Sequence, residues 1–218
     1  MSTPGRPSAV SRNGAALRVV VALAAAGVFL GALWAWLAPP IGGVIALTRG
    51  GDRVKAHLGA EADHWFTSAA LLLGMLSVVA VVGAVWVWQW KAHRGPLMVT
   101  ALAVGTVAAA ATTTGVGALL ARLRYGAVDI AAAPVSEQQR VYYITEAPSV
   151  FFGHSPLQIA VTLLYPAAVA AVVYLLAAVG TPRDDLGAWP PIDYPITPTG
   201  RSVTAVDVPP VVPTSPSP

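Results

Sequence analysis

The apolar residues of this chain fall into four long blocks. They span about residues 17–38, 65–90, 96–121 and 155–179, and the only charged residue inside them is Arg18, at the edge of the first block. A helix of about 20 apolar residues crosses the hydrocarbon core of a bilayer, which is roughly 30 Å thick. The pattern therefore predicts an all-α membrane protein with four transmembrane helices.

The segments outside the blocks divide the chain further. We expect a cytoplasmic N-terminal segment over residues 1–16, a four-helix membrane domain over 17–180 and a disordered tail over 181–218. The tail is rich in proline and has no long apolar run, so it has too little apolar surface to form a core.

Two longer connections, about residues 39–64 and 122–154, carry a different pattern. Residues 44–48 and 53–58 flank a Gly-Gly pair, which is typical of a β-hairpin. Residues 141–145, in the second connection, are rich in β-branched and aromatic side chains and favour another strand. The sequence thus predicts a small cap containing β-strands on one side of the membrane.

A short basic connection, from Lys91 to Arg94, suggests the orientation. Short loops that carry Lys and Arg stay on the cytoplasmic side of a membrane. With this turn inside, both termini are cytoplasmic and the two longer connections face outward. We therefore expect a multi-pass protein of the inner (plasma) membrane.

The composition agrees with this interpretation and excludes several kinds of site. Of the 218 residues, 56% are hydrophobic and only 11% are charged, whereas about a quarter are charged in soluble domains. The chain has no cysteine, which excludes disulfides, thiolate metal sites and cysteine nucleophiles. No cofactor motif is present, so we expect no cofactor. The basic residues lie between the apolar blocks, which favours lipid headgroups over nucleic acid as a partner.

Tryptophans gather at the ends of the blocks, where indole rings commonly lie at the headgroup level. Packing in the helical core is the alternative. The residues concerned are Trp34, Trp36, Trp65, Trp86, Trp88 and Trp90.

Small residues recur every four positions in two of the blocks. Such rows let helix backbones approach closely in lipid, either within the bundle or against a partner. The first row is Gly27 and Gly31, and the second is Gly105, Ala109, Thr113 and Gly117.

Few residues qualify for binding chemistry. His57, Glu61 and His64 would share one face of a helix, where His154 could supply a fourth metal ligand. Alternatively, Glu61, Asp63 and His64 only cap the second apolar block at its N-terminal end. A second hypothesis is that basic residues of the longer connections bind anionic headgroups, against the alternative of solvated flanks. These basic residues are Arg49, Arg53, Lys55, Arg122 and Arg124.

Four stretches of sequence together resemble a known family. They are residues 33–40, residues 51–55 with 61–64, residues 88–96 and residues 151–154. They are similar to an actinobacterial, mycobacterial-type family of multi-spanning membrane proteins that is catalogued as a domain of unknown function. The resemblance covers about residues 17–190. It implies no activity, ligand or site residue.

We interpret the chain as a non-enzymatic assembly or accessory subunit of a cell-envelope system. A small transporter or a lipid-handling protein is the alternative, and an enzyme is the third hypothesis. Its expected partner is the lipid bilayer, with another envelope membrane protein, a homo-oligomer or an anionic lipid as further alternatives. A stoichiometric partner would favour the first hypothesis, bound lipid the second, and a buried water-filled cavity lined by His57 and His154 the third.

Overall fold

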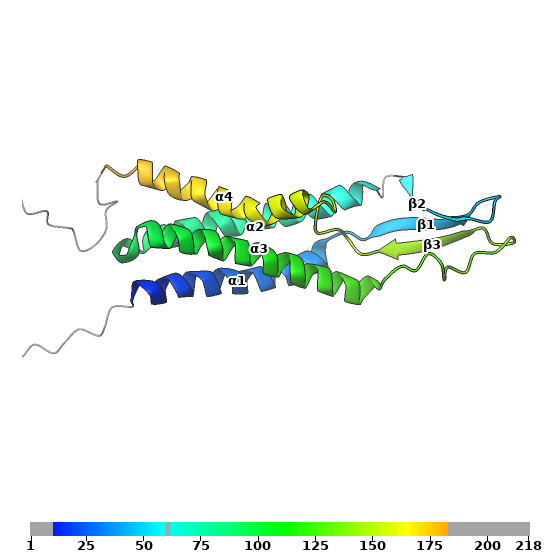
Figure 1. Ribbon diagram of the computed structural model, residues 1–218, viewed down its shortest axis with the longest axis horizontal. Coiled ribbons are helices and arrows are strands. Elements are labelled where there is room, and N and C mark those ends of the chain that lie inside the picture. Colours follow the sequence, from blue (N-terminus) through cyan, green and yellow to red (C-terminus); the bar gives the residue numbers. More distant parts are fainter. Residues whose placement is uncertain (1–10, 60–61, 183–218) are drawn as a thin grey trace, which may run out of the picture.

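Four long helices run side by side along the length of the molecule (Figure 1). The computed structural model describes residues 11–59 and 62–182. The helices are α1 (Arg12–Leu37), α2 (Ala62–Gln89), α3 (Pro96–Tyr125) and α4 (Pro156–Val179). All four are long and apolar enough to cross a membrane. The predicted fold class, a membrane protein with four spanning helices, is confirmed. The predicted tail lies outside the described residues from residue 183 onward.

Local sequence signals set the ends of the helices. Ser11 precedes α1, and its hydroxyl accepts a hydrogen bond from a backbone amide of the first turn. Ser155 precedes α4 and forms a capping box with Gln158. At the other end of a helix, Arg122 and Arg124 lie in the last turn of α3. Their positive charges interact favourably with the negative end of the helix dipole.

The helices do not contact one another equally. α1 packs against α3 along most of its length, α4 packs against both α2 and α3, and α1 touches α2 much less. The start of α1 and the end of α4 lie at one end of the bundle, and a three-stranded sheet lies at the other (Figure 1). We call the two ends the termini end and the cap end.

The two rows of small residues face each other between α1 and α3, and all six of their members are buried. A side chain at Gly27 would collide with the backbone of Ala109, and the Thr113 hydroxyl donates to the Gly27 carbonyl at 3.0 Å. A Cβ at Gly31 would lie 2.7 Å from the Thr113 carbonyl oxygen and 3.0 Å from the Gly117 nitrogen. The two backbones are therefore in direct contact.

The same contact continues toward the termini end. A Cβ at Gly105 would lie 2.7 Å from a methyl carbon of Leu23. The Thr112 hydroxyl donates to the Ala24 carbonyl of α1 at 3.1 Å. Small residues and interhelical hydrogen bonds thus recur over several turns of both helices.

Trp34 belongs to the core of the bundle. Its side chain is fully buried, and its indole N–H donates to the Ser68 carbonyl of α2 at 2.9 Å. The ring also covers Gly117 of α3. For this residue the alternative of core packing is correct, because the absence of a side chain at Gly117 leaves room for the indole. Trp36, two residues on, is 72% exposed.

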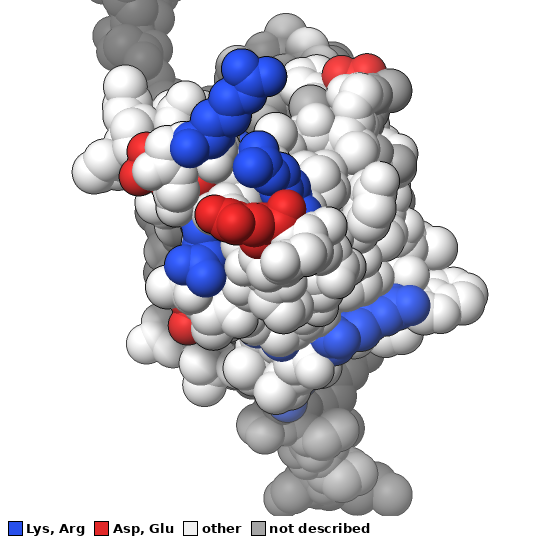
Figure 2. All heavy atoms as spheres, turned by 90° about the vertical axis from the view of Figure 1, so that its right-hand side faces the viewer, with Lys and Arg blue, Asp and Glu red and all other residues white. Residues whose placement is uncertain are grey.

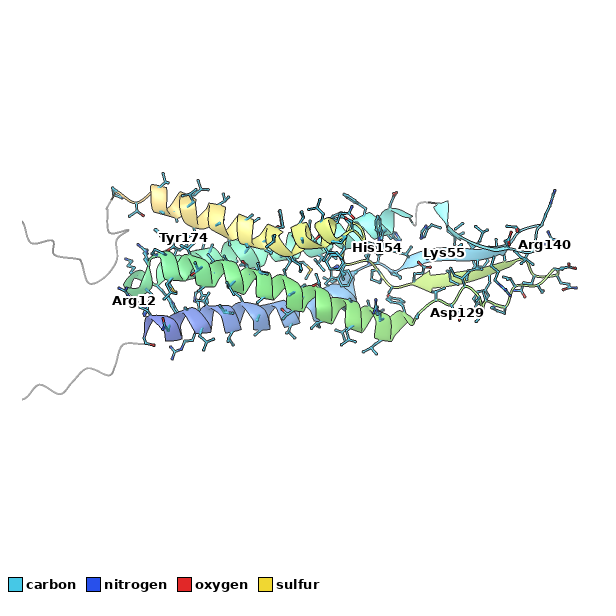
Figure 3. The ribbon with its side chains drawn as sticks, viewed as in Figure 1. Arg12, Lys55, Asp129, Arg140, His154 and Tyr174 are labelled. Atoms are coloured by element: carbon cyan, nitrogen blue, oxygen red, sulfur yellow. The ribbon has the colours of Figure 1, made fainter. Side chains whose placement is uncertain are left out.

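An aromatic cluster joins the helices at the termini end. The Arg94 guanidinium lies 4.1 Å from the centre of the Trp88 ring, and its Nε donates to the Trp88 carbonyl. Trp88 in turn makes an edge-to-face contact with Tyr174 of α4, which Figure 3 labels. The basic turn, which includes the short helix η2 (Lys91–His93), is held against α4 in this way.

The cap contains the three strands β1 (Ile41–Leu47), β2 (Arg53–His57) and β3 (Val141–Glu146). They form an antiparallel sheet in the order β2-β1-β3. The predicted hairpin and the predicted third strand are confirmed. Gly51, in the hairpin turn, has φ +87°, a conformation that other residues rarely adopt.

Candidate ligand-binding site

A cavity of about 700 Å³ lies at the junction of the cap and the helices. Its walls come from all three strands, from α2, α3 and α4, and from the connection between β3 and α4. Two of its residues, Lys55 and His154, are labelled in Figure 3. The polar lining residues are Lys55, His57, Arg122, Glu146, Ser149 and His154, and the apolar ones include Ile41, Trp65, Ala118, Ala121, Val150, Phe151 and Ile159.

An ion pair crosses the sheet at the wall of this cavity. The Lys55 ammonium lies 2.5 Å from one carboxylate oxygen of Glu146 and donates to the other at 2.7 Å. Lys55 is opposite Ile45 and Glu146 is opposite Ile41, so Gly43 lies between them on the central strand. A Cβ at Gly43 would lie 3.3 Å from a side-chain carbon of Ile144, so the glycine makes room for Ile144 on the face that carries the ion pair.

Arg122 is the other formally charged side chain of the lining. It is exposed, in the last turn of α3, and no ion pair involves it among the described residues. The Glu146 charge is already opposed by Lys55. The cavity therefore has an excess positive charge, even with both of its histidines neutral.

The two histidines of the cavity come from different parts of the chain. His57 ends β2, and His154 immediately precedes the N-cap of α4. The His154 ring stacks on Trp65 of α2, with 6.5 Å between ring centres and 17° between planes. The stacked rings of Trp65 and His154 form an aromatic part of the cavity wall, near the start of α2.

The helical face proposed for a metal ion is not formed as expected, because His57 lies in a strand and His64 in α2. His64 Nδ1 lies 3.0 Å from the Pro40 carbonyl oxygen instead. Glu61 lies outside the described residues. Within residues 11–59 and 62–182, no group of three or more His, Asp and Glu side chains is placed to hold a metal ion.

The five basic residues considered for headgroup binding separate in space. Lys55 and Arg122 line the cavity, whereas Arg124 lies over the Tyr125 ring, with 5.3 Å from its guanidinium carbon to the ring centre. Arg49 and Arg53 are exposed on the hairpin. Viewed toward the cap end, Lys and Arg side chains are spread around the surface, with acidic side chains between some of them (Figure 2). The basic residues thus form no single continuous patch on this face.

Comparison with known proteins places the chain in a family. Residues 23–188 match the family described as "Protein of unknown function (DUF2567)", a range that includes most of α1, the other three helices and the cap. The chain belongs to the DUF2567 family. This confirms the resemblance drawn from the sequence.

Relatives of this DUF2567 protein occur in mycobacteria. It is 52% identical over 175 residues to an uncharacterized protein of Mycobacterium tuberculosis and to one of Mycobacterium bovis, covering 80% of this chain and 91% of each relative. An uncharacterized protein of Mycobacterium leprae is 49% identical over 169 residues, covering 78% of this chain and 85% of the relative. No solved structure matches the chain.

Sequence reasoning about this DUF2567 protein missed Glu146 as a member of the site. The alternation of side chains along the strand could have found it, because residues two apart share a face of a sheet. Glu146 therefore shares a face with Ile144, which lies opposite Gly43 next to the cavity. Pairing with Lys55, 91 positions earlier, depended on strand order, which the sequence pattern does not specify.

The lining of the cavity in this DUF2567 protein combines two kinds of chemistry. Lys55 of β2 and Arg122 at the end of α3 provide cationic groups, and aromatic and aliphatic side chains come from both the helices and the cap. The Ser149 hydroxyl donates to the Phe151 carbonyl at 2.7 Å. Within the described residues, no hydrogen bond links Ser149 to either histidine. The arrangement suits an anion with an apolar part better than it suits nucleophilic catalysis.

Proposed function

We propose that this protein is a non-enzymatic lipid-handling protein of the cell envelope that binds an anionic lipid in the junction cavity. The observation that carries this proposal is that one cavity is lined both by the cationic Lys55 and Arg122 and by the apolar Trp65 and Ile159. A phosphate or carboxylate headgroup would contact the cationic groups. The first carbons of the lipid would contact the helix walls.

Arg122 is the main headgroup contact in this proposal. A guanidinium presents parallel N–H donors that match a phosphate or carboxylate, and such charge-assisted hydrogen bonds are stronger than neutral ones. Lys55 adds further N–H donors, and Glu146 balances its charge and holds its side chain in place. The pair also keeps the net charge of the cavity low, which favours one headgroup rather than unspecific anion binding.

The lipid is proposed to enter from the leaflet next to the cap. Trp65 lies near the start of α2, Ile159 near the start of α4, and Ala118 near the end of α3. These positions form the cap end of the bundle, where headgroups meet the hydrocarbon core if the helices span the bilayer.

The test is titration of purified protein with short-chain phosphatidylglycerol, with phosphatidylcholine as the neutral lipid. We expect phosphatidylglycerol to raise the melting temperature more than phosphatidylcholine does. Arg122→Glu should weaken phosphatidylglycerol binding by about ten- to a hundredfold, since a hydrogen bond to a charged group contributes about 1.5–3 kcal/mol. Arg124→Glu is the matched control, because it makes the same charge change on the same helical turn outside the cavity lining. Equal loss in both variants would contradict a specific site.

We further propose that the cap is extracytoplasmic and that both termini are cytoplasmic, in the inner membrane. The basic turn at Lys91 and Arg94 supports this orientation. In the cysteine-free chain, a membrane-impermeant maleimide on intact cells should label Glu137→Cys and should not label Ala92→Cys. Both positions are exposed. The reverse labelling would overturn the orientation.

An assembly role is the second candidate function, and the exposed apolar face of the cap sheet favours it. An enzyme is not proposed, although the structure brings His57 and His154 to one cavity. His154 stacks on an indole and Ser149 donates to a nearby carbonyl, so the described residues of the cavity form no hydrogen-bonded nucleophile and base.

A further inference from the structure

One face of the cap sheet is apolar and exposed. Side chains alternate between the two faces of a strand. The strand residues that line the junction cavity lie on one face, and the residues next to them in the sequence lie on the opposite face. We call this opposite face the open face. It carries Val44 and Ala46 of β1, Val54 and Ala56 of β2, and Val141, Tyr143 and Thr145 of β3.

Several side chains of the open face are strongly exposed. Tyr143 is 70% exposed, Val54 is 48% exposed and Val141 is 41% exposed. On the other face, Ile41 and Ile45 are buried, and Ala133 and Val135 of the connection before β3 pack against Ile45. The hydrophobic core of the cap therefore lies on one side of the sheet only.

The distribution of charge between the two faces is the reverse of the usual one. Antiparallel sheets with one solvated face normally carry polar residues there. Here the charged strand residues all lie on the face opposite the open face, the one that lines the junction cavity, as their register with β1 shows. They are Arg53, Lys55 and Glu146. The open face has no charged member. A contiguous exposed apolar surface of this kind marks an interaction site.

We propose that the open face is the interface with a second copy of this chain. A two-fold symmetric contact places each surface against itself, so any charge on it would oppose a like charge near the axis. The open face has no charge and meets this condition. A partner selected through charge complementarity would need a charged surface, which the open face lacks.

The direction of the strands supports the same partner. They run roughly along the axis of the helices, and the cap extends beyond one end of the bundle (Figure 1). Two copies inserted in the same sense hold their caps at the same height above the membrane. A two-fold axis along the membrane normal then brings the two open faces together with aligned strands, which is a common mode of sheet packing at about 10 Å separation.

This proposal does not depend on lipid binding in the junction cavity. The cavity and the open face lie on opposite sides of the sheet, and the seven open-face residues named above are not among those that line the cavity. A failure of either proposal leaves the other intact.

The first experiment is cross-linking in native membranes, where the lack of cysteine removes background. Ala46→Cys lies on the central strand of the open face, so two symmetry-related copies should bring these cysteines close together. We expect a disulfide-linked dimer on mild oxidation. Arg53→Cys, exposed on the other face of the sheet, is the control and should give little dimer. A cross-link from Ala46→Cys to a different protein, or no cross-link at all, would overturn the proposal.

The second experiment measures the mass of the protein in nanodiscs or mild detergent. We expect wild type to be a dimer and Tyr143→Asp to be a monomer with a nearly unchanged melting temperature. Tyr142→Asp is the matched control, because it makes the same substitution at the adjacent residue, which is 39% exposed on the opposite face. It should remain a dimer. A monomeric wild type, or equal dissociation of both variants, would contradict the interface.

Discussion

Helix α1 makes two very different contacts, one with α3 and one with α2. Against α3, the glycines of both helices bring the backbones together, and the Thr113 hydroxyl bonds to the Gly27 carbonyl. Against α2, side chains such as Leu23, Val79 and Trp86 hold the helices apart around an apolar groove of about 450 Å³. The two contacts lie in the same bundle, and α2, which α1 contacts less closely, is the more apolar of the two neighbours.

The difference shows what holds helices together in lipid. Lipid tails are as apolar as leucine, so burying more hydrocarbon between helices provides little net driving force. Close packing of small residues and interhelical hydrogen bonds remain, and α1 has both with α3. Along the groove with α2, lipid tails can solvate the side chains as well as a helix would. The exception is Trp34, whose indole bonds to α2 near the cap end.

The largest effect is expected where a side chain is forced into the α1–α3 contact. A Cβ at Gly117 would lie 2.8 Å from the Trp34 ring, so Gly117→Leu must displace the indole or separate the helices. Overpacking of this kind costs about 1–3 kcal/mol and sometimes more. Thermal unfolding in detergent measures the loss.

Gly115→Leu is the control for this substitution. Gly115 is on the same helix and is exposed, and a Cβ added there would meet no other atom within 4 Å. We expect little loss of stability there. If the two leucine variants unfold at the same temperature, the small row has no special role in packing.

An intermediate effect is expected at the link between α1 and α2. Trp34→Phe removes the indole N–H that donates to the Ser68 carbonyl and leaves a small void. The loss of a buried hydrogen bond and some packing should lower stability by about 1–2 kcal/mol. Trp36→Phe, at an exposed position on the same helix, should change stability much less. Equal effects would mean that the buried indole contributes nothing beyond its apolar area.

The smallest effect is expected from a single interhelical hydrogen bond. Thr113→Val keeps the shape of the side chain and removes the bond to the Gly27 carbonyl, which should cost about 0.6 kcal/mol. Thr106→Val is equally buried but loses only hydrogen bonds within its own helix. Combining Thr113→Val with Gly27→Ala tests whether the two sites are coupled. A loss at Thr106 larger than that at Thr113 would contradict a stabilising role for the interhelical bond.

Features that depend on residues close together in the sequence were easier to predict than features that depend on residues far apart. The hairpin was predictable because its strands are separated by a few residues with a clear turn signal. The helix assumed to carry both His57 and His64 was wrong at His57, because this residue ends strand β2. The burial of Trp34 was not predictable from α1 alone, since the space for its ring is created by a glycine 83 positions later, on α3.

The sequence by itself determined the four helices, the strands of the cap and the small rows, because hydrophobic length, periodicity and turn chemistry act within short segments. Only the tertiary structure decided that α1 pairs with α3, that Lys55 meets Glu146 and that the junction cavity draws its walls from six elements. It also decided which face of the sheet is left uncovered. These outcomes depend on contacts between residues far apart in the chain, where many pairings satisfy the same local pattern and only their combined packing selects one.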